Sequence, residues 1–285
     1  MGRPRWGRLD GATARAMSHT RTQLKTRTTT KTTTTTMATT MGTMREMHGC
    51  DAEAMPRASA SASASASSTF DVFKGVDRTA ATVVFEDDAR GVRVCVRQNR
   101  DGDIEVDPTA RWVWDCAPKT CEHLCARAEE LVQGKRVVEI GAGTGLPGLV
   151  CAQLGAKTCT LTDLPSELLL LEENVASNDT RACVVDVDAL AWGDLGDRFQ
   201  REHFDLCICS DVLYHQPLHV FRKLADTLKA VVKKPGGTLV FAYYFRENLI
   251  HDAHFFEYLD EAFEEKARVE FADCPDVWLF ELVLR

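Results

Sequence analysis

The chain has 285 residues, enough for one large domain or two small ones, and its 45% apolar content can supply a sizeable core. Residues 1–68 contain ten Lys and Arg against four Asp and Glu, so the net charge of −8 comes entirely from residues 69–285. An acidic body lacks the basic surface that binding to a nucleic-acid backbone requires, so we expect no nucleic-acid partner. No apolar run approaches the roughly 18 residues of a membrane span, so we expect no membrane association either.

Residues 1–68 are low in complexity. Thr dominates residues 20–43, and residues 58–68 are a near-perfect alternation of Ser and Ala, patterns that cannot bury a core. We predict that residues 1–68 form a disordered basic tail and that residues 69–285 form one domain. We expect the protein to be cytoplasmic. The Arg-rich and hydroxyl-rich beginning also suits a plastid or mitochondrial transit peptide. The alternatives to a transit peptide are a flexible tail without a targeting role and a gene model that starts too far upstream.

From residue 82 onward, strand patterns alternate with helix patterns. Two apolar alternations, Thr82–Phe85 and Val92–Val96, flank an Asp-rich turn and predict a β-hairpin. Buried strands are expected at residues 136–140, 158–162, 183–187, 204–210, 238–245, 268–271 and 277–284. Helices are expected at residues 118–132, 147–154, 165–177, 217–232 and 252–263.

Strands that alternate with helices predict a parallel sheet with helices on both faces. The last two strands differ, because only residues 272–276 join them and a right-handed crossover needs a longer connection. They should therefore be antiparallel neighbours. The predicted fold is an α/β, Rossmann-like sheet, mostly parallel with an antiparallel C-terminal strand and an N-terminal β-hairpin extension.

In the middle of the chain, a strand leads into a turn of three alternate glycines and then into a helix. Gly141, Gly143 and Gly145 permit positive φ and the close approach of a ligand to the backbone. The dinucleotide fingerprint requires a glycine where Leu146 stands, and the Gly-Lys-Ser/Thr of a phosphate loop is absent. Glu139, on the strand itself, would repel a pyrophosphate and suits a ligand that carries an amino group.

Polar and aromatic side chains follow the strands, at the edge where a sheet of this kind binds its ligand. Asp163 ends the second strand, where its carboxylate can accept hydrogen bonds from both hydroxyls of a ribose or can cap the next helix. Trp192 follows the third strand, and its indole can stack on an adenine or belong to the core. Ser210 and Asp211 end the fourth strand, and Tyr214 follows closely.

Six short motifs, taken in order and with their spacing, resemble the family-16 protein lysine methyltransferases, a branch of the seven-strand, S-adenosylmethionine-dependent class. They are Val113-Trp114, Glu139-Ile-Gly-Ala-Gly-Thr-Gly145, Thr162-Asp163, Glu173-Asn174-Val175, Leu190-Ala-Trp192-Gly193 and Asp211-Val-Leu-Tyr214. The last motif is similar to that family's Asp/Glu-x-x-Tyr signature. The low-complexity tail has no counterpart in the resemblance.

The resemblance implies a protein-lysine N-methyltransferase that uses S-adenosyl-L-methionine and acts on a protein substrate. It implies that Asp211 and Tyr214 face the acceptor lysine. The residues that it implies for cofactor binding lie at strand ends and before the first helix; they are Trp114, Glu139, Gly141, Ala142, Gly143, Asp163, Trp192 and Ser210. The reaction is an in-line displacement of the sulfonium methyl by an amine, so the protein mainly aligns donor and acceptor.

The acceptor lysine must arrive neutral, although its reference pKa is near 10.4. Burial of its stem against Tyr214 would lower that pKa. The charge of Asp211 alone disfavours deprotonation, so we assign Asp211 to positioning rather than to general-base work. His215, next to Tyr214, either relays a proton or is structural.

The eleven cysteines are odd in number, and several lie on apolar faces. They predict buried free thiols in a reducing compartment rather than a disulfide framework. The spacing of Cys116, Cys121 and Cys125 differs from the Cys-x3-Cys-x2-Cys of radical enzymes that use the same cofactor, so we expect no metal. We expect a monomer.

Two other classes of function stay open. A methyltransferase of the same fold that acts on nucleic acid usually has an Asn/Asp-Pro-Pro-Tyr/Phe element after the fourth strand, where this chain has Asp211-Val-Leu-Tyr214. A small-molecule acceptor is the other enzymatic alternative. Outside enzymes, the chain could be a binding or scaffold module with a decayed cofactor site. The intact residues at this site argue against decay; they are Gly141, Gly143, Asp163 and Asp211.

Overall fold

The computed structural model describes residues 76–77, 80–98, 108–214, 216–246 and 249–285. The tail predicted over residues 1–68 lies outside these residues, as does His215. The division of the chain at residue 69 therefore stays a prediction. Within the described ranges, no helix combines the length and the apolar character of a membrane span.

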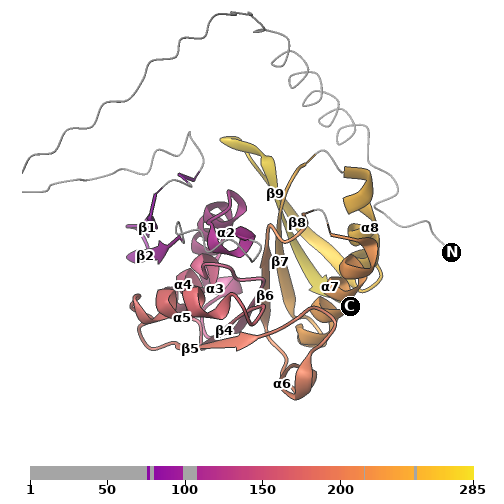
Figure 1. Ribbon diagram of the computed structural model, residues 1–285, viewed down its shortest axis with the longest axis horizontal. Coiled ribbons are helices and arrows are strands. Elements are labelled where there is room, and N and C mark those ends of the chain that lie inside the picture. The colour runs from indigo at the N-terminus through magenta and orange to yellow at the C-terminus, as the bar shows by residue number, and fades with distance from the viewer. Residues whose placement is uncertain (1–75, 78–79, 99–107, 215, 247–248) are drawn as a thin grey trace, which may run out of the picture. The chain divides into compact units, whose positions relative to one another are not determined.

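A seven-stranded sheet forms the centre of the described chain (Figure 1). Its strands are β3 (Arg136–Ile140), β4 (Thr158–Asp163), β5 (Val184–Ala189), β6 (Leu206–Ser210), β7 (Thr238–Tyr244), β8 (Phe263–Phe271) and β9 (Cys274–Leu284). They lie in the order β5-β4-β3-β6-β7-β9-β8. The first five in this order are parallel, and β9 runs antiparallel to both β7 and β8. The predicted fold class, a mostly parallel sheet with an antiparallel C-terminal strand, is confirmed.

Helices cover both faces of this sheet (Figure 1). One layer contains α2 (Cys116–Ala126), α3 (Ala128–Leu131), α4 (Leu146–Gln153) and α5 (Leu168–Ala176). The other contains α6 (Gly196–Arg201), α7 (Leu218–Val231) and α8 (Leu249–Asp260). Each layer of helices packs on the sheet through its own hydrophobic core. Along β7, Val240 and Ala242 belong to the core under α2 to α5, whereas Leu239 and Phe241 belong to the core under α6 to α8. This alternation of apolar side chains toward both faces is what a buried parallel strand requires.

Some elements differ from the predicted ones. β8 begins at Phe263 rather than at Arg268, because charged, outward-facing residues between the two conceal the apolar alternation of a half-exposed strand. The helix expected over residues 118–132 is two helices, α2 and α3, separated at Arg127. The short α6 and the 3-10 turn η2 (Pro108–Arg111) were not predicted, since elements of four to six residues carry little periodic signal.

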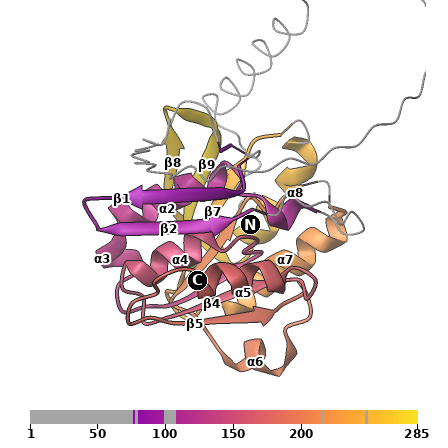
Figure 2. The same ribbon diagram turned by 60° about the vertical axis from the view of Figure 1, so that its left-hand side comes forward.

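The predicted hairpin consists of β1 (Thr82–Asp87) and β2 (Val92–Arg97), which pair antiparallel outside the main sheet. Its inward-facing valines share the core of the α2 to α5 layer; they are Val83, Val92, Val94 and Val96. Figure 2 shows the hairpin lying across α2, α4 and α5. The hairpin therefore packs on the helix that follows the glycine loop.

Candidate active site

The glycine loop joins β3 to α4 at the edge where the parallel strands end. Gly141, Gly143 and Gly145 have φ angles of 68°, 54° and 79°. A Cβ atom on Gly143 would lie 2.8 Å from the carbonyl oxygen of Ala110, and one on Gly141 would lie 2.9 Å from Cγ1 of Val212. Both φ and contact distance thus favour glycine at these two positions, and bare backbone lines this edge of the sheet.

Glu139 lies on β3, shortly before this loop, and contacts the helix that follows the loop. Its side chain is buried, with 2% of the residue exposed, and Oε2 accepts a hydrogen bond from the N–H of Gly148 at 2.9 Å. Gly148 is in the first turn of α4, where a free N–H favours an acceptor. Burial raises the pKa of Glu139 to about 8, against the opposing effect of the Gly148 N–H. Glu139 therefore holds the junction of loop and helix, and its contact with a ligand amino group stays a prediction.

Asp163, at the end of β4, contacts the glycine loop directly. Its Oδ2 accepts a hydrogen bond from the N–H of Gly143 at 2.7 Å, and its Oδ1 accepts one from the N–H of Leu164 at 2.7 Å. The N–H of Ala142 donates to the carbonyl of Thr162 at 2.9 Å, which holds the same stretch of loop to β4. Burial raises the pKa of Asp163, while the two N–H donors oppose that rise. Because each carboxylate oxygen has a second lone pair, Asp163 can also accept hydrogen bonds from ribose hydroxyls.

Trp192 stands beside the loop, after β5. Its Cζ2 atom lies 3.7 Å from the position of a Cβ on Gly141. The N–H of the next residue, Gly193, donates to Oγ1 of Thr227 on α7 at 2.9 Å, which fixes the turn. The structure thus brings the predicted aromatic side chain to the predicted loop.

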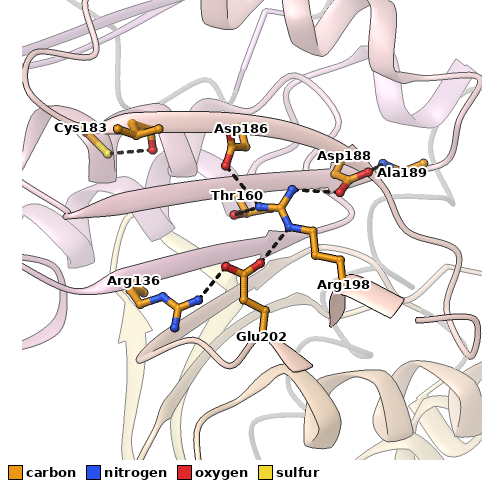
Figure 3. Close-up of polar contacts among 9 residues, drawn as sticks. Arg136, Thr160, Cys183, Asp186, Asp188, Ala189, Arg198 and Glu202 are labelled. Atoms are coloured by element: carbon orange, nitrogen blue, oxygen red, sulfur yellow. Dashed lines mark hydrogen bonds and ion pairs between the residues drawn. The ribbon is translucent and has the colours of Figure 1, made fainter. Parts of the chain in front are cut away.

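Arg198 of α6 ties the segment after Trp192 to the sheet (Figure 3). Its guanidinium donates to Asp188 at 2.9 Å and to Asp186 at 3.2 Å, both on β5. It also donates to Glu202 at 2.8 Å, and Glu202 accepts a second hydrogen bond from Arg136 of β3 at 2.8 Å. These contacts hold α6, which follows Trp192 in the sequence, against β5 and β3.

Ser210 and Asp211, at the end of β6, lie on the other side of the loop. Oγ of Ser210 is 3.4 Å from Oγ1 of Thr120 on α2. Asp211 has a positive φ of 55°, and its carboxylate accepts hydrogen bonds from Nη1 and Nη2 of Arg246 at 2.7 and 2.8 Å. Although burial opposes it, this ion pair raises the pKa of Arg246. Asp211 is therefore a buried carboxylate whose charge is balanced by a bidentate guanidinium.

Trp114 and Tyr214 meet through Thr109 of η2. Nε1 of Trp114 donates to the carbonyl oxygen of Thr109 at 2.7 Å. Oγ1 of Thr109 donates to the hydroxyl oxygen of Tyr214 at 3.1 Å. Ala110, the next residue of η2, lies against Gly143. One short turn thus connects two predicted site residues and places them at the glycine loop.

Two residues of this site were missed by sequence reasoning. Arg246 follows the end of β7, so the rule that singled out Asp163 and Asp211 at strand ends could have found it. Thr109 follows no strand and belongs to a turn without periodic signal, so no pattern in the sequence indicated it.

These residues fit S-adenosylmethionine. The loop offers bare backbone, Asp163 offers acceptor lone pairs beside it, and Trp192 offers an aromatic ring at its flank. Of the residues implied for cofactor binding, Glu139 and Ala142 are buried, with 2% and 7% of the residue exposed. Within the ranges that the structure describes, no group of three or more His, Cys, Asp or Glu side chains could hold a metal ion.

A family model described as lysine methyltransferase matches residues 102–262, which is more than half of the chain. The chain therefore belongs to the lysine methyltransferase family, whose methyl donor is S-adenosylmethionine. The resemblance drawn from the six motifs and the predicted cofactor are both confirmed.

Curated relatives agree with this assignment. The protein N-terminal and lysine N-methyltransferase EFM7 of Candida albicans is 32% identical over 163 residues, which cover 51% of this chain and 62% of the relative. The protein N-lysine methyltransferase METTL21A of Danio rerio is 38% identical, with 45% and 57% covered. The EEF1A lysine methyltransferase 3 of Mus musculus is 34% identical, with 46% and 53% covered. The chain thus spans somewhat more than half the length of each of these relatives.

The buried carboxyl of Glu139 makes stability depend on pH. Its folded-state pKa of about 8 lies above the usual value of 4.5, so folding favours the protonated form. The stability that this contributes is complete below about pH 4.5 and is lost as pH rises toward 8. Glu139→Gln stays neutral and can still accept the Gly148 N–H, so its unfolding free energy should fall less than that of the wild type between pH 5 and 8. Urea denaturation at several pH values measures this difference.

Glu270→Gln, at an exposed position of β8, is the control for loss of one surface charge. Its stability should follow the wild-type pH dependence. Parallel curves for Glu139→Gln and the wild type would contradict the raised pKa of Glu139.

Proposed function

We propose that this protein is an S-adenosylmethionine-dependent protein-lysine N-methyltransferase. The main support is the grouping of Trp114, Tyr214 and the Asp211–Arg246 pair beside the glycine loop. The chain that carries this grouping belongs to the lysine methyltransferase family. The names of the relatives specify methylation of protein amines, which supports the same acceptor chemistry. The acidic body, residues 69–285, suits a basic segment of a protein substrate.

When bound, S-adenosylmethionine supplies a sulfonium methyl group that an uncharged amine can displace. Asp163 would accept hydrogen bonds from its ribose, and the indole of Trp192 would cover its adenine. The backbone of the glycine loop would pass beside it, and Ser210 would lie at the end that carries the methyl group. Each of these elements is fixed by hydrogen bonds to the rest of the fold, so the protein orients the donor before the acceptor arrives.

The acceptor lysine must lose a proton before it can attack. An unpaired carboxylate beside the amine would stabilise the ammonium form and oppose that loss. Arg246 offsets the charge of Asp211, so the pair presents no net charge to the incoming amine. Asp211 can then position groups at this edge without raising the pKa of the lysine.

Trp114 and Tyr214 are both half-buried aromatic residues linked through Thr109. Their rings would enclose the apolar stem of a lysine, and burial of the stem lowers the pKa of its amine. The hydroxyl groups of Thr109 and Tyr214 would direct the amine toward the methyl group. This division of work needs no strong general base.

The proposed activity can be tested with labelled S-adenosylmethionine, the full chain and a cell lysate, followed by mass spectrometry of the labelled species. We expect the label on lysine side chains of protein. Tyr214→Phe should lower the initial rate about tenfold or more while changing cofactor affinity by less than about twofold, because the hydroxyl acts on the acceptor side.

Tyr258→Phe is the matched control, since Tyr258 lies on α8 and packs against Arg222 of α7. It should keep the wild-type rate. Label found on RNA, or only on amino-terminal amines, would contradict the lysine assignment. Full activity in Tyr214→Phe would contradict the acceptor site.

The role of Arg246 predicts a change in pH dependence. Arg246→Gln leaves the buried carboxylate of Asp211 without its cation, which should cost about 3–5 kcal/mol of stability and raise the pKa of the acceptor amine. The pH profile of label transfer to the main lysate band should therefore move upward by about one unit or more.

The double variant Arg246→Gln, Asp211→Asn removes the carboxylate charge as well, so its pH profile should return toward that of the wild type. A profile that stays in place in Arg246→Gln, despite reduced activity, would mean that Arg246 only supports the fold.

A further inference from the structure

Three side-chain carboxamides occupy the outer edge of β2, the edge that does not pair with β1. Gln153, Asn178 and Asn174 bond to the alternate residues Arg93, Cys95 and Arg97, respectively. Each carboxamide accepts the N–H of its residue at 2.8–2.9 Å and donates to the carbonyl oxygen of the same residue at 2.8–3.2 Å. A carboxamide has the donor and acceptor of a peptide group, so the three take the place of a neighbouring strand.

Asn174 differs from the other two in what its second hydrogen reaches. Its Nδ2 also donates to the carbonyl oxygen of Thr144 at 3.0 Å, in the middle of the glycine loop. Asn178 instead donates to the carbonyl of Asn174, and Gln153 to that of Asp179. The side chain of Asn174 is fully buried and uses its oxygen and both N–H hydrogens. Of the three carboxamides, Asn174 alone connects the hairpin to the glycine loop.

Gln98, directly after β2, makes a second connection to the site. Its Oε1 accepts a hydrogen bond from the N–H of Val113 at 2.8 Å, and Val113 precedes Trp114. Its Nε2 donates to the carbonyl oxygens of Asp77 and Ala80 at 3.2 and 3.0 Å. Gln98 is also buried, with 3% of the residue exposed. Two consecutive residues therefore connect the hairpin to the two sides of the site: Arg97 through Asn174 to the glycine loop, and Gln98 through Val113 to Trp114.

We propose that Asn174 and Gln98 are positioning residues for the cofactor, and that the β1–β2 hairpin sets the separation between the glycine loop and Trp114. The glycines leave the loop with few side chains to fix its conformation, so a hydrogen bond to the carbonyl of Thr144 has a large share in fixing it. The hairpin is then part of the cofactor site and not a separate element for substrate recognition. This inference concerns cofactor binding and does not depend on lysine being the acceptor.

Asn174→Asp keeps the shape of the side chain, removes both donors and sets a carboxylate oxygen against the carbonyls of Arg97 and Thr144. Asn178→Asp is the matched control, because it breaks the same kind of bond to β2 without contacting the loop. In calorimetric titration of the full chain with S-adenosylhomocysteine, the affinity of Asn174→Asp should be about tenfold or more below that of the wild type. The change for Asn178→Asp should stay below about threefold.

Amide hydrogen exchange without ligand gives a second readout. Exchange should become faster at residues 141–146 in Asn174→Asp and should stay at the wild-type rate there in Asn178→Asp. Equal loss of affinity in both variants would mean that the hairpin acts only through general stability, and wild-type affinity in Asn174→Asp would remove the connection; either result overturns the proposal.

If Asn174→Asp does not fold, Gln98→Met decides the question from the other side of the site. Methionine keeps the length of the side chain and loses the bond to the N–H of Val113. Affinity for S-adenosylhomocysteine about tenfold below that of the wild type supports the proposal, and wild-type affinity overturns it.

Discussion

The glycine loop is short of side chains, so its conformation depends on hydrogen bonds that neighbouring elements supply. Asp163 of β4 accepts one from within the loop, Glu139 of β3 accepts one from the first turn of α4, and Asn174 of α5 donates to a loop carbonyl. β3 and β4 are parallel neighbours that end together, which is why one carboxyl group reaches the loop and a second reaches the start of the helix after it. The fold therefore serves the proposed reaction by fixing one stretch of bare backbone.

Two buried carboxyl groups near this loop are stabilised in different ways. Glu139 has a backbone N–H as its hydrogen-bond partner, and burial raises its pKa to about 8. Asp211 instead pairs with the guanidinium of Arg246 in a bidentate geometry. The first group can be neutral in the folded protein, whereas the charge of the second is balanced. Neither of these two acidic side chains therefore presents a strong negative charge to an incoming amine.

The sequence was sufficient for the parts of the site that follow from local pattern and strand order. The short connection at residues 272–276 predicted the antiparallel end of the sheet, and strand ends predicted Asp163, Trp192 and Asp211. Contacts between segments that are distant in the sequence could not be predicted from local pattern. Burial under α4 decided the orientation of Glu139, and the pairing of Arg246 with Asp211 spans 35 residues. The motif around Asn174 was recognised from resemblance, but its bonds to Thr144 and Arg97 join segments that are 30 and 77 residues apart in the sequence.

We propose that this edge of the sheet binds S-adenosylmethionine and that Asp163 is essential for that binding. Calorimetric titration of the full chain with S-adenosylmethionine tests it directly. We predict one site per chain in the wild type, affinity lower by about a hundredfold in Asp163→Ala, and unchanged affinity in the control Glu270→Ala, an exposed acid on the edge strand β8. Absence of binding by the wild type, or wild-type affinity in Asp163→Ala, would contradict this cofactor site.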